Sequence, residues 1–490
     1  MTDNPQIISG STVAIFDPHH AFTQSGGATF DFIEEQDGYV DQLAGFEFFL
    51  PPEARAGPSP GTIIRLPLRT VAGADTSRIK NEPVKVDKMR QLFQDFIDDE
   101  LAISMLFLTS ISSIELWEVD ERGRKTCLAN AELTKSAFTR DDIADGVRTT
   151  YRCNVRVSKS EAVELSQDWR ILQASYSDTG AADLLSARLG YDATPTLSSQ
   201  KLRPEVAVAM PFPIFPDHAH GRLYTYLPLP LSTGFPCHIH GLFALTPDRQ
   251  HLRNGEETGV VEGSDRYVAR LYSAGGYNTY HRDAFVRNSV PVAWNSLLFD
   301  TYIPRTWAHL LPILLENDQV QHVFDALPLS QPIAKGGDTM YWNSLPLHVL
   351  RGITQDNLRV WPISFDPDSS DGSPLYSDIR SVLVAPDTAR EETLQALAAV
   401  GVMTSRPPQY VTDLLVTGNL GITLLDPHTV HVVLLVSMLS LLLSICVHQP
   451  FFLRRKSISF IRAICNGIWL MKLSAICYLQ GTSHSSSDYL

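Results

Sequence analysis

The most constraining feature of this sequence is that its apolar residues follow two different periods in separate stretches. Alternating apolar and polar residues, which place one side of a β-strand in a core, occur at 61–69 (GTIIRLPLR), 111–120 (ISSIELWEVD) and 149–157. Spacing by three and four, which forms the apolar side of an amphipathic helix, occurs at 86–97. The sequence therefore predicts an α+β protein.

Further elements follow from shorter patterns. A strand is predicted at 11–16, where STVAIF precedes Asp17-Pro18, and strands are also predicted at 206–213 (VAVAMPFP) and 221–231 (GRLYTYLPLPL). Helices are predicted at 291–316 and 388–401. We interpret Asp17 as a turn residue because it precedes a proline.

One stretch carries the composition of a loop. Residues 176–204 are rich in Ser, Thr, Gly and Asp. These residues favour turns over regular elements. We therefore expect a long surface loop here.

Length and charge narrow the class of protein. The chain has 490 residues, 44% of them hydrophobic, which suffices for two to four domains with buried cores. Its formal charge of −14 leaves no basic field for phosphates, so nucleic acid is not expected as a partner. The six cysteines form no CxxC pair, and the start of the chain lacks the pattern of a secretory signal. Both observations favour a cytoplasmic protein with reduced thiols.

An apolar tail offers a different location. Residues 430–447 contain no Asp, Glu, Lys or Arg, and the basic segment FFLRRK follows them. Eighteen residues is the lower limit for a membrane-spanning helix. Three interpretations stay open: a membrane span, a buried helix, or a mispredicted end that belongs to no fold.

Histidines suggest a metal site at first sight. His218 and His220 lie in PDHAHGR, while Cys237, His238 and His240 lie in PCHIHG. A His-X-His pair on a strand puts both imidazoles on one side of the sheet, which suits zinc. However, no HExxH or comparable helical pair accompanies them. We therefore expect no metal.

Motifs of catalysis are missing from the sequence. It contains no GxSxG nucleophile elbow, no GxxxxGK[ST] phosphate loop and no GxGxxG. Its cysteines have no recognisable catalytic neighbours. The residues by themselves therefore predict no catalytic group and no enzyme.

Five blocks in a constant order nevertheless resemble one family, the sacsin proteins of the GHKL superfamily of ATPases and heat-shock chaperones. The blocks are TDNPQIISGSTVAIFDPHH at 2–20, GTIIRLPLR at 61–69, LFLTSISSIELWEVD at 106–120, LPLPLSTGFPCHIHGLFALTPDRQHLR at 227–253 and WNSLLFDTYIPRTWAHLL at 294–311. The resemblance covers roughly residues 5–435. Its specificity comes from the order of the blocks, since a lone FDPHH or Gly-Thr pair would mean little.

The resemblance implies an ATP site that this chain holds only in part. GHKL sites use an acidic residue and an Asn on a first helix, an Asp in a glycine turn and a glycine-rich lid, and we expect all of these upstream of Met1. Thr62 would remain for the adenine side, and Arg249 would sit where the family's chaperones place an Arg that reaches the γ-phosphate. ATP and Mg²⁺ are therefore expected as cofactors only if the missing segment is supplied.

The resemblance also implies an arrangement of domains. We expect a truncated Bergerat-type (GHKL) α/β sandwich at 1–125, an α/β middle domain at 145–275, a mainly helical region at 285–430 and the apolar tail at 431–490. The implied function is that of a chaperone-related or scaffold protein in protein quality control, which contacts other chaperones or client proteins. The alternatives are an ATPase completed upstream or by a partner chain, and a protein tethered to a membrane through residues 430–447.

Overall fold

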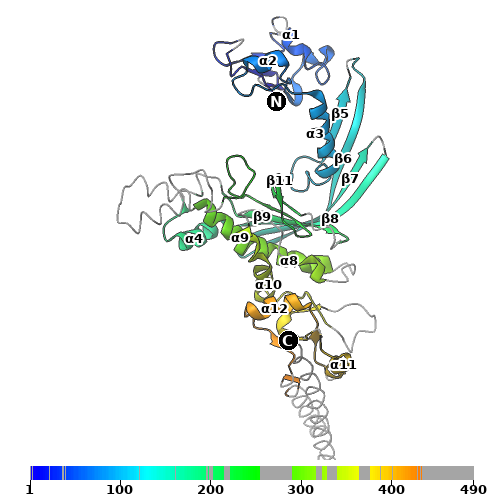
Figure 1. The fold of residues 1–490 in the computed structure, drawn as a ribbon, viewed down its shortest axis with the longest axis vertical. Coiled ribbons are helices and arrows are strands. Elements are labelled where there is room, and N and C mark those ends of the chain that lie inside the picture. Colours follow the sequence, from blue (N-terminus) through cyan, green and yellow to red (C-terminus); the bar gives the residue numbers. More distant parts are fainter. Residues whose placement is uncertain are drawn as a thin grey trace, which may run out of the picture. The chain divides into compact units, whose positions relative to one another are not determined.

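The computed structural model describes the chain from residue 2 to residue 432. A few short interruptions and the longer stretches 215–220, 254–289, 316–322, 328–338 and 364–375 are outside this description. The chain divides into two compact units, residues 1–100 and 101–490. Each unit is described by itself (Figure 1).

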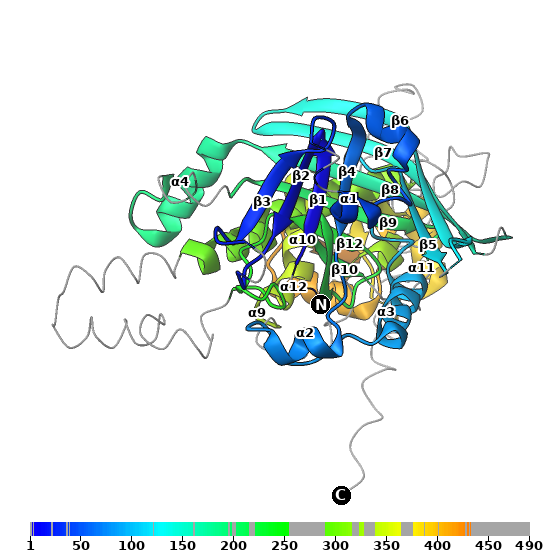
Figure 2. The same cartoon turned by 90° about the horizontal axis from the view of Figure 1, so that it is seen from above.

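Unit 1 is built on a small antiparallel sheet with the strand order β3-β2-β1-β4 (Figure 2). Its strands are β1 (Gln6–Gly10), β2 (Thr12–Phe16), β3 (Gly27–Asp31) and β4 (Ser59–Arg65). The predicted strands at 11–16 and 61–69 are thus confirmed. Gly10, at a φ of 60°, allows the tight turn that joins β1 to β2.

One side of this sheet carries the core of unit 1. Ile8 pairs with Val13, which pairs with Phe30, and all three are buried. Because side chains alternate along a strand, these residues share one side. They form a cluster with Phe32, Leu43, Phe46 and Leu50.

Short helices complete unit 1. They are α1 (Val40–Ala44), the 3-10 helix η2 (Pro52–Ala56), α2 (Val71–Thr76) and α3 (Val86–Asp99). The hydroxyl oxygen of Thr70 accepts a hydrogen bond from the amide of Gly73 and so caps the amino end of α2. The helix predicted at 86–97 is confirmed as α3.

Unit 2 is built on an eight-stranded sheet with the order β11-β10-β12-β9-β8-β7-β6-β5. The strands are β5 (Ser113–Val119), β6 (Lys125–Ile143), β7 (Gly146–Lys159), β8 (Ala162–Tyr176), β9 (Glu205–Phe212), β10 (Arg222–Thr225), β11 (Leu227–Ser232) and β12 (His238–Gly241). The pairing is antiparallel except between β10 and β12. Alternate burial along β7 confirms the period of two read from the sequence.

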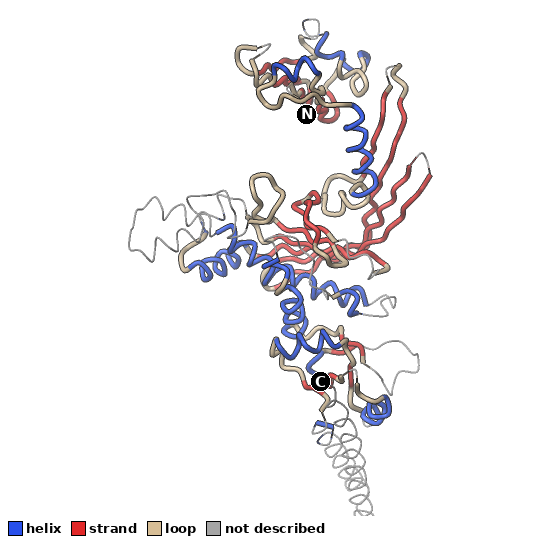
Figure 3. Tube along the Cα trace, in the orientation of Figure 1, coloured by secondary structure: helices blue, strands red, loops and turns tan. Residues whose placement is uncertain are grey.

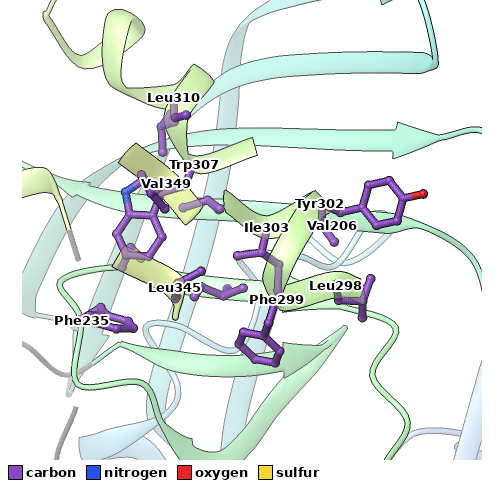
Figure 4. Packing of buried hydrophobic residues seen from close by; sticks show 14 of the residues in the cluster. Val206, Phe235, Leu298, Phe299, Tyr302, Ile303, Trp307, Leu310, Leu345 and Val349 are labelled. Carbon is purple, nitrogen blue, oxygen red and sulfur yellow. The ribbon is translucent and has the colours of Figure 1, made fainter. Parts of the chain in front are cut away.

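Helices cover one side of this sheet. The helical stretch predicted at 291–316 contains a π-helical segment η3 (Leu298–Tyr302) followed by α8 (Ile303–Leu315), and α10 (Leu345–Gln355) packs on α8 (Figure 3). Trp307 lies against Phe235, with 5.6 Å between ring centroids (Figure 4). The cluster also contains Val206 and Val208 of β9, so the sheet and the helices share one core.

The prediction of a long surface loop at 176–204 is partly wrong. Residues Asp178–Leu189 form helix α4, with Ser177 as its N-terminal cap and Gly190 in a left-handed conformation at its end. Ala181, Ala182 and Leu185 are buried on its inner side. Polar composition concealed a helix because small apolar residues suffice to pack it.

Toward its end, the described chain mixes helices with short strands. The helices are η4 (Val323–Ala326), α9 (Thr339–Trp342), η5 (Ile379–Ser381), α11 (Glu391–Ala399) and α12 (Gln409–Thr417), so the helix expected at 388–401 is confirmed. β13 (Trp361–Pro362) pairs with β14 (Tyr376–Ser377), and β16 (Thr404–Ser405), β15 (Leu383–Val384) and β17 (Thr423–Leu424) form a third small sheet. The protein therefore has a mixed α and β fold.

The membrane interpretation concerns residues that are largely outside the description. Of the segment 430–447, only residues 430 and 432 are described. Among the helices that the structure does describe, none is both long and apolar enough to cross a membrane.

Candidate functional site

Thr62 lies on the side of the four-stranded sheet that faces away from the core of unit 1. It is exposed, and its hydroxyl is 3.0 Å from that of Ser9, its cross-strand neighbour. Strand alternation places Thr62 and the core residue Ile63 on opposite sides. The adenine contact implied by the family would therefore have to form on this outer side.

Apolar residues lie near Thr62 on the same side of the sheet. Ile7 pairs with Ala14 on β2 and with Ile64 on β4, which places the three side chains together. We call the surface formed by Ile7, Ala14, Phe16, Thr62, Ile64 and Leu66 the outer face. Three of its large members are strongly exposed, at 47% for Phe16, 61% for Ile64 and 52% for Leu66, while Ile7 is half-buried. Grouped apolar side chains in water are typical of binding surfaces.

Asp17 lies at the end of β2, next to the outer face, and acts as a turn residue. It is buried, and its carboxylate accepts a hydrogen bond of 2.7 Å from the amide of Thr23. The hydroxyl of Thr23 donates to the same oxygen at 3.2 Å. The interpretation of Asp17 from the sequence is confirmed.

Arg249 lies in unit 2, at the tip of a turn. Its amide donates to the carbonyl of Thr246 at 2.8 Å, and its φ of 57° is in the left-handed region. The turn is further closed by Thr246, whose hydroxyl donates to Asp248 and lowers the pKa of that carboxyl. The Arg249 side chain is exposed. Since Thr62 and Arg249 belong to different units, neither unit holds both.

His238 is a buried part of the sheet in unit 2. Its Nδ1 accepts a hydrogen bond of 3.0 Å from the amide of Arg222. Its ring lies 5.1 Å from that of Trp169 and 5.4 Å from that of Tyr224, measured between centroids. Burial lowers the pKa of His238 to about 3, so its imidazole is neutral at pH 7.

His240 has the same kind of environment two residues later. Its Nδ1 accepts from the amide of Tyr226 at 3.2 Å, and Phe107 stacks on its ring with 5.4 Å between centroids. Burial lowers its pKa to about 4. Both histidines thus serve as neutral hydrogen-bond acceptors inside an aromatic cluster.

The residues of the PCHIHG motif do not converge. Cys237 belongs to the core on the helix-covered side of the sheet, whereas His238 and His240 project from the other side, as alternation requires. Burial raises the pKa of the Cys237 thiol. Within the described residues no three side chains of His, Cys, Asp or Glu gather as metal ligands do. His218 and His220 lie outside those residues.

A polar network that no local sequence motif marks joins the sheet of unit 2 to α8. Asp145, in the turn between β6 and β7, pairs with Arg305 of α8. Arg305 also lies 3.8 Å from Asp356, which contacts Nε2 of His309 at 2.7 Å. Burial lowers the pKa of His309, while Asp356 opposes this shift. The partners are far apart in the chain, so no local motif marks them.

Two comparisons with known proteins bear on this geometry. A family model described as the sacsin domain matches residues 1–130, which comprise unit 1 and the beginning of the sheet in unit 2. Sacsin from Homo sapiens is 23% identical, over 61% of this chain and 7% of sacsin itself. The chain therefore matches only a small part of this relative. These matches agree with the resemblance read from the ordered blocks, and the chain is a sacsin-like protein.

Proposed function

We propose that this chain is a chaperone-related or scaffold protein that acts through contacts with other proteins, and that its outer face makes such contacts. The observation that carries this proposal is the exposure of Phe16, Ile64 and Leu66 on one side of the sheet in the sacsin-matched segment. When a partner covers such a surface, the free energy of the complex is lowered by about 25 cal/mol for each Å² of apolar area removed from water.

The chemistry of the outer face indicates the class of partner. Aliphatic and aromatic side chains lie beside the hydroxyls of Ser9 and Thr62. The charged Asp31 lies on the same side of the sheet but on the far strand β3, where the hydroxyl of Ser11 donates to it. Such a surface suits apolar segments of unfolded clients or of other chaperones. The net charge of −14 argues against nucleic acid. We propose a cytoplasmic location for this activity.

A light-scattering assay tests the proposal. The full chain is added to a model enzyme that aggregates on heating, and the rate of aggregation is measured. Ile64→Lys places a charge in the outer face and should abolish protection. Thr76→Lys adds the same charge at the end of α2 and should leave protection unchanged, because Thr76 is exposed in a helix and is no part of the outer face. Equal protection by both variants would refute the role of the outer face.

An ATPase completed by an upstream segment or a partner chain is the second candidate. What favours it is the position of Thr62 on the edge strand β4, beside the apolar residues of the outer face, where a covering segment could close a pocket. In that case Ile64→Lys would weaken assembly with the completing segment rather than protection of clients. Nucleotide titration of an upstream-extended chain separates the two candidates.

A further inference from the structure

Helix α3 carries an apolar stripe that is largely open to water. Its members follow helical spacing and are Val86, Met89, Leu92, Phe93, Phe96 and Ile97. Only Ile97 is buried, whereas Val86, Leu92 and Phe93 are 55%, 48% and 47% exposed. Among the residues that the structure describes, none covers the stripe over most of its length.

Most of the charges on α3 oppose the helix dipole, with Asp87 in the first turn, paired with Arg90, as the exception. Lys85 and Lys88 lie at the amino end, where a helix favours anions. Asp98 and Asp99 lie in the last turn, which contains no basic residue. The N-cap position is Lys85, whose side chain makes no capping hydrogen bond. A helix with these features gains from an opposite charge pattern placed beside it.

We propose that two copies of this chain associate through α3, with the two helices antiparallel. In this arrangement Met89 of one copy faces Phe96 of the other, and Leu92 faces Phe93. Each basic amino half lies against an acidic carboxyl half, and the two dipoles oppose one another. A second copy of α3 that runs in the opposite direction presents the same charges in reverse order. Its acidic half therefore lies beside the basic half of the first copy, which is why we choose a second copy as the partner.

The flank of the stripe specifies the charge pairs. Lys88, Asp95 and Asp99 are spaced by seven and four residues, so they follow one edge of the stripe, and all three are exposed. Antiparallel helices bring the same edge of both copies together. Lys88 of each copy then lies between Asp95 and Asp99 of the second copy.

The size of the contact sets its strength. A 14-residue helix is about 21 Å long. A pair of such helices buries less than the roughly 1,200 Å² of a standard stable interface. The association is therefore weak and depends on concentration and salt.

Sedimentation equilibrium of the full chain over increasing concentration tests this association, which does not rest on the proposed function. Phe93→Lys should weaken dimerisation at least tenfold. Gln94→Lys adds the same charge at an exposed position of α3 beside Asp98, away from Lys88, Asp95 and Asp99, and should weaken it far less. A chain that stays monomeric throughout, or a dimer that both variants leave intact, would overturn the proposal.

A charge exchange tests the antiparallel arrangement. Lys88→Glu makes the flank acidic, and Asp95→Lys with Asp99→Lys makes it basic. Each variant alone should be monomeric, while an equimolar mixture should form heterodimers. A mixture that stays monomeric would contradict the antiparallel pairing. The Ile64→Lys variant should dimerise normally, so failure of the outer face and failure of α3 are distinguishable.

Discussion

Tyr176 at the end of β8 donates a hydrogen bond to Thr306 of α8, across 130 residues of sequence. The two oxygens are 2.9 Å apart, and the hydroxyl proton of Thr306 is directed to the carbonyl of Tyr302 at 2.8 Å, which leaves Tyr176 as the donor. Burial raises the pKa of Tyr176, which keeps its hydroxyl protonated. The bond joins the sheet of unit 2 to the helix that covers it.

Tyr176→Phe should therefore lower the free energy of unfolding by about 0.5–1.5 kcal/mol, because it removes a buried donor and keeps the ring. Urea denaturation measures the change. In a Thr306→Val background, the same substitution should cost much less. A full loss in that background would mean that the tyrosine hydroxyl acts through another partner.

Phe243→Ala should lower the free energy of unfolding by about 3–5 kcal/mol, since it removes a buried ring. Phe243 is buried and stacks on Phe299 with 5.5 Å between centroids. The apolar alternation of the 227–253 block would bury Leu245 as well, but Leu245 is only half-buried. Leu227→Ala, at an exposed position, is the control. An unchanged melting midpoint for Phe243→Ala would contradict its place in the core.

Stability should fall as the pH drops below about 6.5. The pKa values of His238 and His240 are about 3 and about 4 in the folded chain, below the ordinary value of 6.5. The unfolded chain therefore binds more protons between these values, and protonation favours unfolding. Between pH 6.5 and 5 the loss is about 1.6 kcal/mol per histidine, because the unfolded imidazole is already half protonated at pH 6.5.

Denaturant titrations at several pH values measure this slope. Replacing both His238 and His240 by Gln should reduce the change of the free energy of unfolding with pH. A smaller pH dependence should persist, because the pKa values of His309 and His348 are also lowered. A slope unchanged by the double substitution would show that the two imidazoles are not the groups that titrate.

The purified protein should contain no tightly bound zinc. His238 and His240 direct Nδ1 to backbone amides, and Cys237 projects to the other side of the sheet. Elemental analysis of the full chain decides this. Stoichiometric zinc that is lost in a His238→Ala, His240→Ala variant would prove the expectation wrong.

The chain alone should not bind ATP with micromolar affinity. The resemblance carries only Thr62 and Arg249 of a nucleotide site onto this chain, and one exposed cation contributes little to the binding of an anion in water. Calorimetric titration with ATP and Mg²⁺ tests this. Micromolar binding that Arg249→Ala abolishes would place the pocket within this chain.

The sequence predicted those elements whose burial follows a regular period. The strand around Tyr151 and the helix 86–97 were correct because alternate or every third to fourth residue is apolar. Helix α4 was missed because its packing uses alanines among polar residues, which weakens the pattern. The period of the apolar residues predicts which side of an element is buried. A helix whose buried side is made of alanines has only a weak period, so the sequence does not predict it.

The candidate site was less predictable than the fold. Family blocks led to Thr62, but only the strand register shows that Ile7, Ala14 and Ile64 lie on the same side of the sheet as Thr62. The pair of Asp145 and Arg305 depends on the packing of α8 on β8, which no local sequence motif encodes. Contacts between distant segments follow from tertiary packing.

The position of β12 has a consequence for the growing chain. It is the last strand of the large sheet to be synthesised, yet it lies between β9 and β10. Until residues 238–241 leave the ribosome, β9 has an open edge and the β10–β11 hairpin has nothing to join. Open edges pair readily with other strands. The ribosome-bound chain therefore needs protection from misassembly until this one strand closes the gap.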